Sequence, residues 1–178
     1  MARTSNPMDN IRKVSVRVPT AEAMRSLGER IGRELLPGDF FGLTGGLGAG
    51  KTVLVQGICQ GCGIDSHEVL SPTFTIVASH RGRLTVHHAD FYRLGDADEL
   101  YATGFDDLVN GESAVLVEWV DQVPEALPPE HVRVHIEGCG EAERRVELSF
   151  LGSRFQGRFA WLTPEADAPA DASEAGKK

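Results

Sequence analysis

The segment DFFGLTGGLGAGKT, residues 39–52, decides the fold of this chain. Its first part, DFFGLT (39–44), is a compact apolar run typical of a buried parallel strand. The Gly-rich residues 45–52 match the pattern GxxxxGK(S/T), and a helix is expected to follow as far as about Gly61. Glycines let a backbone wrap around an anion with its N–H groups aimed at phosphate oxygens, and the helix N-terminus adds positive potential. The sequence therefore predicts a Walker A phosphate loop between a central strand and a helix.

The predicted loop holds the groups that bind a nucleoside triphosphate and its metal ion. Lys51 can reach the β- and γ-phosphates, and the Thr52 hydroxyl can ligate Mg²⁺. The backbone that would surround the phosphates belongs to Gly46, Leu47, Gly48, Ala49 and Gly50.

Acidic residues end two other apolar runs. A P-loop enzyme needs an acid on the Mg²⁺ side at the end of a neighbouring strand. The run AVLVE (114–118) supplies Glu118, which is one methylene longer than the usual Asp and could act directly or through water. The run HADFYR (88–93) supplies Asp90, whose carboxylate could orient an attacking water or hold Mg²⁺ through water. His88 shares the strand face of Asp90, and a packed, hydrogen-bonded imidazole is the better interpretation for it.

Two segments leave alternatives open. The loop Ser71-Pro72-Thr73-Phe74 places two hydroxyls where nucleotide hydrolases often carry a switch segment, but the same residues also suit an ordinary turn. Trp119 either lines the nucleotide or a partner surface, or packs in the core. Arg93 either offsets phosphate charge or pairs with neighbouring acids.

The remaining pattern indicates an α/β fold. Apolar spacing predicts helices over 20–36 and, after an Asp96 cap, over 96–109. Alternating residues predict strands over 14–18, 75–80, 84–92, 132–137 and 144–150, with a hairpin turn at 81–83. Together these elements predict a P-loop NTPase-like three-layer sandwich with a mostly parallel central sheet and antiparallel edge strands. We expect one domain over 11–162, a disordered N-terminus over 1–10, and a disordered acidic Ala/Pro tail over 163–178.

Composition narrows the function further. The chain has 178 residues, with 18 Lys plus Arg against 26 Asp plus Glu, and a net charge of −8. An acidic protein is not expected to bind nucleic acid by itself, because neutralising phosphates requires clustered Lys and Arg. No apolar stretch reaches the ~18 residues of a membrane span, so no membrane partner is expected. Three cysteines and no signal-like N-terminus favour a reducing, cytoplasmic location.

Two metal-like patterns are better explained without a metal. Cys59 and Cys62 form a CxxC, but no second ligand pair with zinc spacing exists, and a helix C-terminus disfavours the thiolate. The alternate residues His131, Arg133 and His135 would share one face of a strand, and a solvated strand face explains them better than a metal site.

Four motifs in order, GLGAGKT, VLSPTF, HADFYRL and VEW, resemble the bacterial TsaE (YjeE) family over about Pro19–Glu137. These are small P-loop ATPases of tRNA threonylcarbamoyladenosine biosynthesis. The resemblance implies ATP and Mg²⁺ as cofactors, slow ATP hydrolysis, and a TsaB–TsaD heterodimer as partner, with tRNA reached only through that complex. It also implies that ATP hydrolysis supports turnover of the complex, whereas the group transfer belongs to the partners.

The resemblance also implies residue roles. Lys51 is the phosphate lysine, Thr52 and Glu118 hold Mg²⁺, and Asp90 is the acid required for hydrolysis. Ser71 and Thr73 belong to the switch-like loop, and Trp119 matches a tryptophan beside the family's acid. The chain departs from the family pattern at Gly46, where an acid is common, and at Val53 and Met24, where Thr is often found.

Rival nucleotide-dependent functions remain. A small-molecule kinase is the main alternative, with Arg81 and Arg83 on the hairpin turn as a thin candidate for a lid. A GTPase normally carries an (N/T)KxD motif, and none of the four lysines is followed by x-Asp. An ABC-type ATPase would carry an LSGGQ-like segment, which is absent from the sequence.

Overall fold

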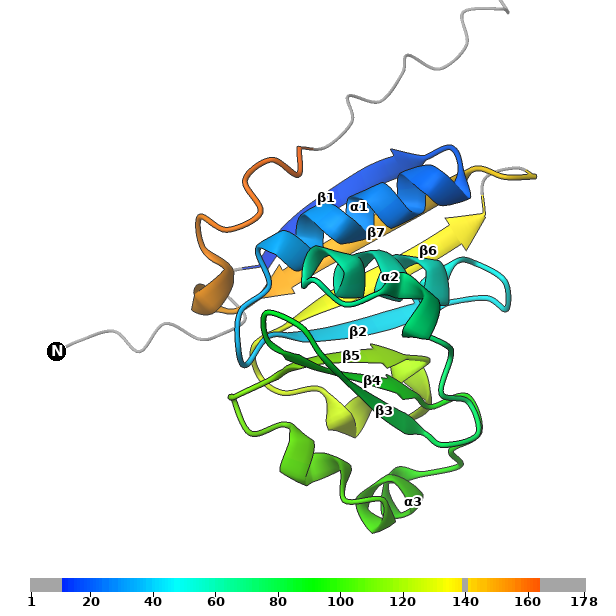
Figure 1. Cartoon of the computed structure of the whole chain (residues 1–178), viewed down its shortest axis with the longest axis vertical. Helices are drawn as coiled ribbons and strands as arrows, with labels where there is room; N and C mark the ends of the chain where they lie inside the picture. Colours follow the sequence, from blue (N-terminus) through cyan, green and yellow to red (C-terminus); the bar gives the residue numbers. More distant parts are fainter. Residues whose placement is uncertain (1–10, 139–140, 164–178) are drawn as a thin grey trace, which may run out of the picture.

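A computed structural model describes residues 11–138 and 141–163 of the chain. In this described part the strands form one sheet in the order β1-β7-β6-β2-β5-β4-β3 (Figure 1). Strands β6, β2, β5 and β4 are parallel neighbours, whereas β1, β7 and β3 pair antiparallel. This confirms the predicted parallel centre and antiparallel edges. The strands are β1 (Ile11–Val18), β2 (Phe40–Gly45), β3 (Val77–Arg81), β4 (Thr85–Asp90), β5 (Ala114–Glu118), β6 (His131–Gly138) and β7 (Arg144–Leu151).

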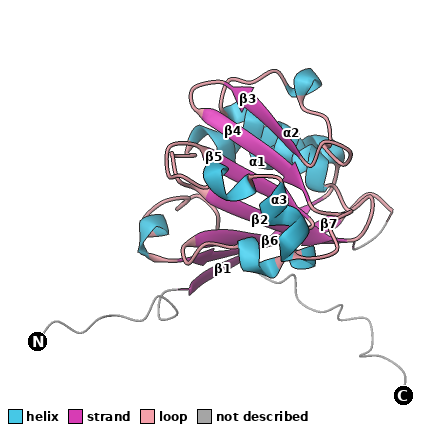
Figure 2. Ribbon diagram, turned by 90° about the horizontal axis from the view of Figure 1, so that it is seen from below, coloured by secondary structure: helices cyan, strands magenta, loops and turns pink. Residues whose placement is uncertain are grey.

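Helices cover both faces of this twisted sheet (Figure 2). The first two α-helices pack together on one face (Figure 1). The third and several short 3-10 helices lie on the other. The α-helices are α1 (Ala21–Arg33), α2 (Lys51–Gly61) and α3 (Ala97–Ala102), and the 3-10 helices are η2 (Ser66–Glu68), η3 (Phe105–Leu108), η4 (Val120–Gln122), η5 (Pro124–Ala126) and η6 (Ser153–Phe155). The segments predicted to be disordered, 1–10 and 163–178, lie outside the described residues except for Thr163.

The helix predicted over 96–109 is wrong in its length. Asp96 does cap α3, because its Oδ1 accepts from the Glu99 N–H at 3.0 Å. The helix ends at Ala102, however, and the separate η3 begins after Gly104. Gly104 has a φ of 74°, in the left-handed region that terminates a right-handed helix. The apolar periodicity of the sequence continues past Gly104, but the left-handed backbone at this glycine ends the helix before it.

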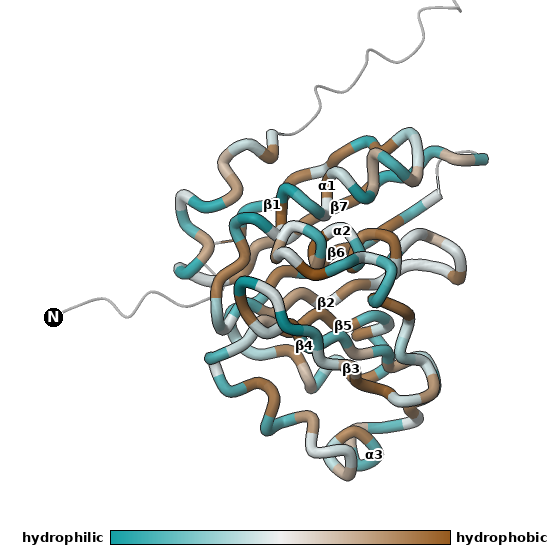
Figure 3. The backbone as a smooth tube through the Cα atoms, in the orientation of Figure 1, coloured by the Kyte–Doolittle hydropathy of each residue, from teal (hydrophilic) through white to brown (hydrophobic). Residues whose placement is uncertain are grey.

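Strand alternation divides the apolar residues between two cores. Phe41, Leu43 and Leu116 pack under α1 and α2. Their neighbours on the same strands, Phe40 and Val115, pack against α3 and η3. Hydrophobic colour follows β2 and β5 in Figure 3, as expected for strands that are buried on both faces. The central strands are thus packed on both faces, and they support the loops that leave the strand ends.

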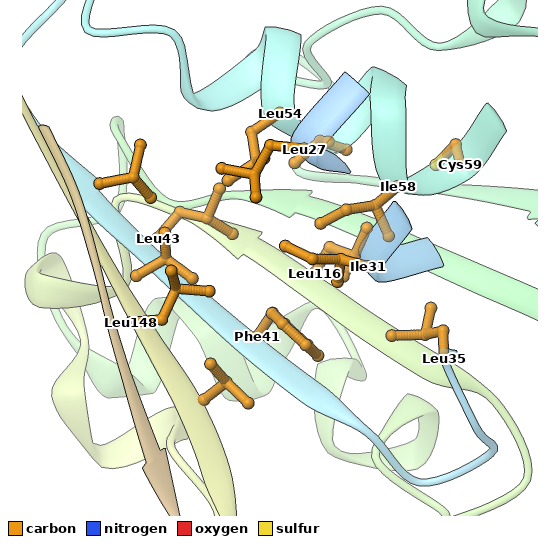
Figure 4. Packing of buried hydrophobic residues seen from close by; sticks show 14 of the residues in the cluster. Leu27, Ile31, Leu35, Phe41, Leu43, Leu54, Ile58, Cys59, Leu116 and Leu148 are labelled. Atoms are coloured by element: carbon orange, nitrogen blue, oxygen red, sulfur yellow. The ribbon is translucent and has the colours of Figure 1, made fainter. Parts of the chain in front are cut away.

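The larger core lies between the sheet and the α1–α2 pair (Figure 4). Leu27, Ile31 and Leu35, from α1 and the turn after it, belong to the same cluster as Phe41 of β2, with Leu27 beside Leu54 and Ile31 beside Leu116. Ile58 from α2 joins the same cluster and is fully buried. The predicted apolar stripe of the first helix is thus confirmed as its inner face. Burying such side chains contributes roughly 1.5–3 kcal/mol each.

Asp39, at the start of β2, anchors the C-terminal part of the domain. Its carboxylate is fully buried and accepts from both terminal nitrogens of Arg158, at 2.9 and 2.6 Å. It also accepts from the Leu36 N–H at 2.9 Å, and Arg154 Nε lies 3.2 Å from its Oδ1. A buried carboxylate with this many donors is a structural tie between distant segments.

We expect Asp39→Asn to lower the free energy of unfolding by about 3 kcal/mol, because it leaves the partly buried guanidinium of Arg158 without its counter-ion. Urea unfolding followed by circular dichroism measures this. Glu29→Gln, which breaks the exposed Glu29–Arg33 pair of α1, is the control and should change the free energy by less than ~0.5 kcal/mol. Equal effects of the two substitutions would contradict the role of Asp39.

Candidate functional site

The candidate site lies at the carboxyl ends of the central parallel strands. Glu118 ends β5, and its backbone is in register with Asp90, which ends β4, and with Leu43 of β2. The loop after β2 leads into α2 at the same edge of the sheet. Ligands of open α/β sheets bind at this edge, where the strands point their carboxyl ends.

The Gly-rich loop has the backbone shape that the sequence predicts. Gly45 has a φ of 137°, and a Cβ there would lie 2.4 Å from the Ile136 carbonyl oxygen. Gly50, which precedes α2 as its N-cap residue, has a φ of 108° and provides no side-chain cap. The first N–H groups of α2 are therefore left to a ligand, which is the usual basis of phosphate binding at a helix N-terminus.

Lys51 is held inside the loop. It is only 4% exposed, and its Nζ donates to the carbonyl oxygens of Gly45 at 2.7 Å and Gly46 at 2.8 Å. The ammonium also lies 3.7 Å from the centre of the Trp119 ring. Burial lowers the pKa of Lys51, and the carboxylates of Glu118, Asp121 and Asp90 oppose that shift. The cation is thus fixed at the mouth of the loop by backbone dipoles and an aromatic face.

Thr52 and Glu118 form the polar pair expected of a Mg²⁺ site. The Thr52 hydroxyl donates to the Glu118 carboxylate, with distances of 2.9 and 3.0 Å to its two oxygens. His88 Nε2 lies 2.8 Å from Glu118 Oε1. Both His88 and Glu118 are buried. The predicted hydrogen-bonded imidazole is confirmed, and its partner is the candidate metal ligand.

Asp90 ties the Ser71–Thr73 loop to the site. Its Oδ2 accepts from the Ser71 hydroxyl at 2.7 Å and the Thr73 hydroxyl at 2.8 Å. Its Oδ1 accepts from the Tyr92 N–H at 2.9 Å. The two hydroxyls also lie 2.8 Å apart. The loop is therefore held against the strand end by one carboxylate, and it does not act as an isolated turn.

These residues surround one cavity of about 420 Å³. It brings together the loop residues Leu47–Thr52 with Ser71, Thr73, Asp90, Glu118 and Trp119, all of them predicted for the site. A second cavity of about 440 Å³ lies on the other side of the loop, next to His135, Glu137 and Arg144, and also includes Gly46. Leu47, Gly48 and Ala49 line both cavities.

The donor set fits a magnesium nucleotide. Thr52 and Glu118 supply hard oxygen ligands, and no group of three or more Asp, Glu, His or Cys able to hold a metal occurs within residues 11–138 and 141–163. Mg²⁺ commonly takes one or two protein ligands and completes its shell with phosphates and water. The same two residues lie beside Lys51 and the N-terminus of α2, so the geometry suits a phosphate-bound metal.

Sequence reasoning missed one residue of the site, Tyr92, and one contact, the partner of His88. Tyr92 lines the cavity, and its ring lies 4.8 Å from that of Trp119. The contact of His88 with Glu118 crosses from β4 to β5, so no spacing along the chain indicates it. Arg93 lies over the exposed Phe74 ring at 4.2 Å and does not line either cavity.

The two metal-like patterns are resolved by burial. Burial, and then the neighbouring Cys62, raise the pKa of the fully buried Cys59 thiol to about 12, which makes a redox role unsuitable. His135 is exposed, as expected, and its Nδ1 lies 2.9 Å from the Thr44 hydroxyl. For His131 the expectation is wrong: it is 5% exposed, and its Nδ1 lies 2.6 Å from the Pro128 carbonyl oxygen.

Among the described residues, no helix is long and apolar enough to cross a membrane.

Comparison with known proteins gives a consistent result. The family model described as threonylcarbamoyl adenosine biosynthesis protein TsaE matches residues 18–146. The tRNA threonylcarbamoyladenosine biosynthesis protein TsaE of Bacillus subtilis is 39% identical over 121 residues, covering 67% of this chain and 75% of the relative. The protein of the same name from Treponema pallidum is 35% identical over 122 residues, covering 68% and 90%. The crystal structure of YdiB from Bacillus subtilis superposes with a TM-score of 0.68 at 28% identity, covering 82% of this chain and 90% of that one.

Proposed function

The chain belongs to the TsaE family and so has a role in tRNA threonylcarbamoyladenosine biosynthesis, and we propose that it acts there as a Mg²⁺-dependent ATPase. In this proposal it binds and slowly hydrolyses ATP and supports a TsaB–TsaD heterodimer, which carries out the group transfer on tRNA. The chain itself reaches tRNA only through that complex. Its net charge of −8 is consistent with a component that does not grip nucleic acid directly.

The observation that carries the proposal is the hydrogen bond from Thr52 to Glu118, 2.9 Å long, at the foot of the Gly-rich loop. It joins a hydroxyl at the start of α2 to a carboxylate at the end of the neighbouring strand. This is the arrangement by which P-loop enzymes hold Mg²⁺ against the β- and γ-phosphates. Mg²⁺ bound there would neutralise charge that develops on the phosphate oxygens.

The other residues then have separate tasks. Lys51 exchanges the carbonyl oxygens of Gly45 and Gly46 for phosphate oxygens, and its charge stabilises the transferred phosphoryl group. Asp90 orients the attacking water or a metal-bound water, and its bonds to Ser71 and Thr73 link that task to the position of the loop.

The position of the acids also suggests where the nucleoside goes. Asp90 and Glu118 fix the γ-phosphate end toward β4 and β5. In this proposal the nucleoside leaves the loop on the opposite side, toward β6, where the second cavity lies. Gly46 borders that cavity, and a Cβ there would meet nothing within 4 Å. The glycine that stands in place of the family's acid therefore leaves open space beside the loop.

Of the two lid candidates of the kinase alternative, Arg81 and Arg83, neither lines a cavity of the site. The Arg83 guanidinium donates to the carbonyl oxygens of Gly32 at 2.9 Å, in the last turn of α1, and of Leu35 at 3.0 Å, just after it. It is committed to the scaffold and lines neither cavity of the site. No observation among the described residues favours an acceptor pocket over the ATPase.

The proposal is tested by measuring Mg²⁺-dependent ATP hydrolysis of the purified chain, alone and with a TsaB–TsaD heterodimer. We expect slow turnover alone and faster turnover with the partners. Asp90→Asn should still bind ATP with Mg²⁺ but lose about 10²-fold or more in rate, the usual contribution of a general base. Failure of the wild type to bind ATP, or an unchanged rate with the partners present, would overturn the proposal.

A further inference from the structure

His88 is a buried imidazole with one contact of chemical consequence. It is 0% exposed, and its Nε2 lies 2.8 Å from Glu118 Oε1. A carboxylate only accepts hydrogen bonds, so Nε2 carries the hydrogen and donates it. The other ring nitrogen, Nδ1, is buried without a hydrogen-bond partner in the described part of the chain. The ring is therefore oriented by its bond to Glu118 and by packing alone.

Glu118 needs such a hold because of its length. A glutamate has one more rotatable bond than an aspartate, so a carboxylate at a strand end can adopt more positions. Its other donor is the Thr52 hydroxyl, which contacts both carboxylate oxygens from α2. A second donor that reaches only Oε1 removes the remaining freedom of the carboxylate and leaves Oε2 facing Thr52.

The sheet makes His88 a fixed support. It lies in β4, which is hydrogen-bonded on both sides, antiparallel to β3 and parallel to β5. The register opposes His88 to Leu116, two residues before Glu118, so the side chain reaches along the strand to the acid. Groups held by the central sheet position a site more accurately than groups on loops.

We propose that His88 is a positioning residue for the metal ligand: its Nε2–H fixes Glu118 Oε1 so that the carboxylate faces Thr52 and the Mg²⁺ of the nucleotide. This inference rests on the proposed function. Hydrogen-bond partners of metal ligands commonly change metal affinity by ~10–100-fold when they are removed. His88 is then the reason why a glutamate can serve at a strand end where aspartate is usual.

The test uses the full chain with His88→Leu, which removes the donor, and His88→Gln, which retains an N–H near the place of Nε2. The matched control is His87→Leu. His87 is the adjacent buried histidine, but its Nδ1 pairs with the Ser79 hydroxyl at 2.8 Å, away from the acid. Binding of a non-hydrolysable ATP analogue is titrated in EDTA and against Mg²⁺, and Mn²⁺ binding is followed by electron paramagnetic resonance. Thermal unfolding is recorded for every variant.

We expect His88→Leu to raise the Mg²⁺ concentration for half-saturation by ~10–100-fold while leaving affinity in EDTA nearly unchanged. His88→Gln should restore most of the metal affinity, and His87→Leu should not alter it. A wild-type Mg²⁺ dependence in His88→Leu, or the same loss in His87→Leu, would overturn the inference.

Two further outcomes separate the inference from the function on which it rests. If His88→Leu does not fold, His88→Asn replaces it, because the shorter amide cannot reach Glu118, and equal metal affinities of the Asn and Gln variants would refute the positioning role. If the wild type itself shows no effect of Mg²⁺ on nucleotide binding, the proposed function fails together with the inference. Normal Mg²⁺ dependence in both wild type and His88→Leu refutes the inference alone.

Discussion

Lys51→Ala is expected to reduce ATP hydrolysis by about 10²–10³-fold, corresponding to ~2.7–4 kcal/mol of lost transition-state stabilisation. Lys51 is the one lysine between Val14 and Gly176, and the structure buries it at the mouth of the phosphate loop. Its ammonium is already oriented by the carbonyl oxygens of Gly45 and Gly46. Alanine removes a positive charge that no other described lysine can replace.

The measurement is single-turnover hydrolysis of ATP with saturating Mg²⁺. Lys13→Ala is the matched control, because Lys13 is exposed on β1 and lies far along the sheet from the loop. It should hydrolyse ATP at the wild-type rate. Retention of activity in Lys51→Ala would show that the loop does not hold the reacting phosphates. Lys51→Arg is expected to be impaired as well, because a planar guanidinium does not fit a site shaped for a compact ammonium.

Gly32→Ala is expected to destabilise the fold by about 3 kcal/mol, although alanine is normally the better helix former by ~1 kcal/mol. Gly32 lies in α1 where it crosses α2. A Cβ there would lie 2.0 Å from the Ile58 carbonyl oxygen and 3.0 Å from the Gly61 Cα. The neighbour is backbone, which cannot rotate away, so the helices must separate. For a domain of this size the melting temperature should fall by ~6–12 °C.

Thermal and urea unfolding measure the effect, and Gly95→Ala is the control. A Cβ at Gly95 would come no closer than 3.6 Å to any atom, and that atom is the end of the flexible Glu99 side chain. If Gly32→Ala stabilised the protein, the close helix packing would be wrong. Because α2 begins at Lys51, a shifted α2 also moves the phosphate lysine and Thr52. Nucleotide affinity should therefore fall together with stability.

The close approach of α1 and α2 illustrates what the sequence did not reveal. Gly28 and Gly32 of α1 meet Gly57 and Gly61 of α2, and a Cβ on any of them would lie 2.5 Å or less from a backbone oxygen of the other helix. The four-residue spacing is visible in the chain. Which two helices pair, however, depends on their both covering one face of the sheet, and local periodicity carries no information about that.

The Glu118 cluster shows the same limit at the site. The sequence separates Glu118 widely from Thr52 and His88, its two partners. Each residue could therefore be judged as a site residue only from its neighbours in the chain. The sequence predicts Asp90 as a candidate acid. Its hydrogen bonds with Ser71 and Thr73, however, form only because their loop folds back across the end of β4. Alternation along the strand predicts a solvated His131, but it is buried and its Nδ1 lies 2.6 Å from the Pro128 carbonyl oxygen.

By itself the sequence determined the Gly-rich loop, the parallel strands on either side of it, and the acids at the strand ends. It could do so because each depends on local rules: glycines at tight turns, apolar runs in buried strands, and a lysine followed by a hydroxyl at a helix start. Only the tertiary structure decided which acid faces Thr52, which histidine supports it, and how α1 holds α2 in place. Those facts depend on strand order and helix packing, which bring residues together across the sheet and leave no spacing in the chain to read.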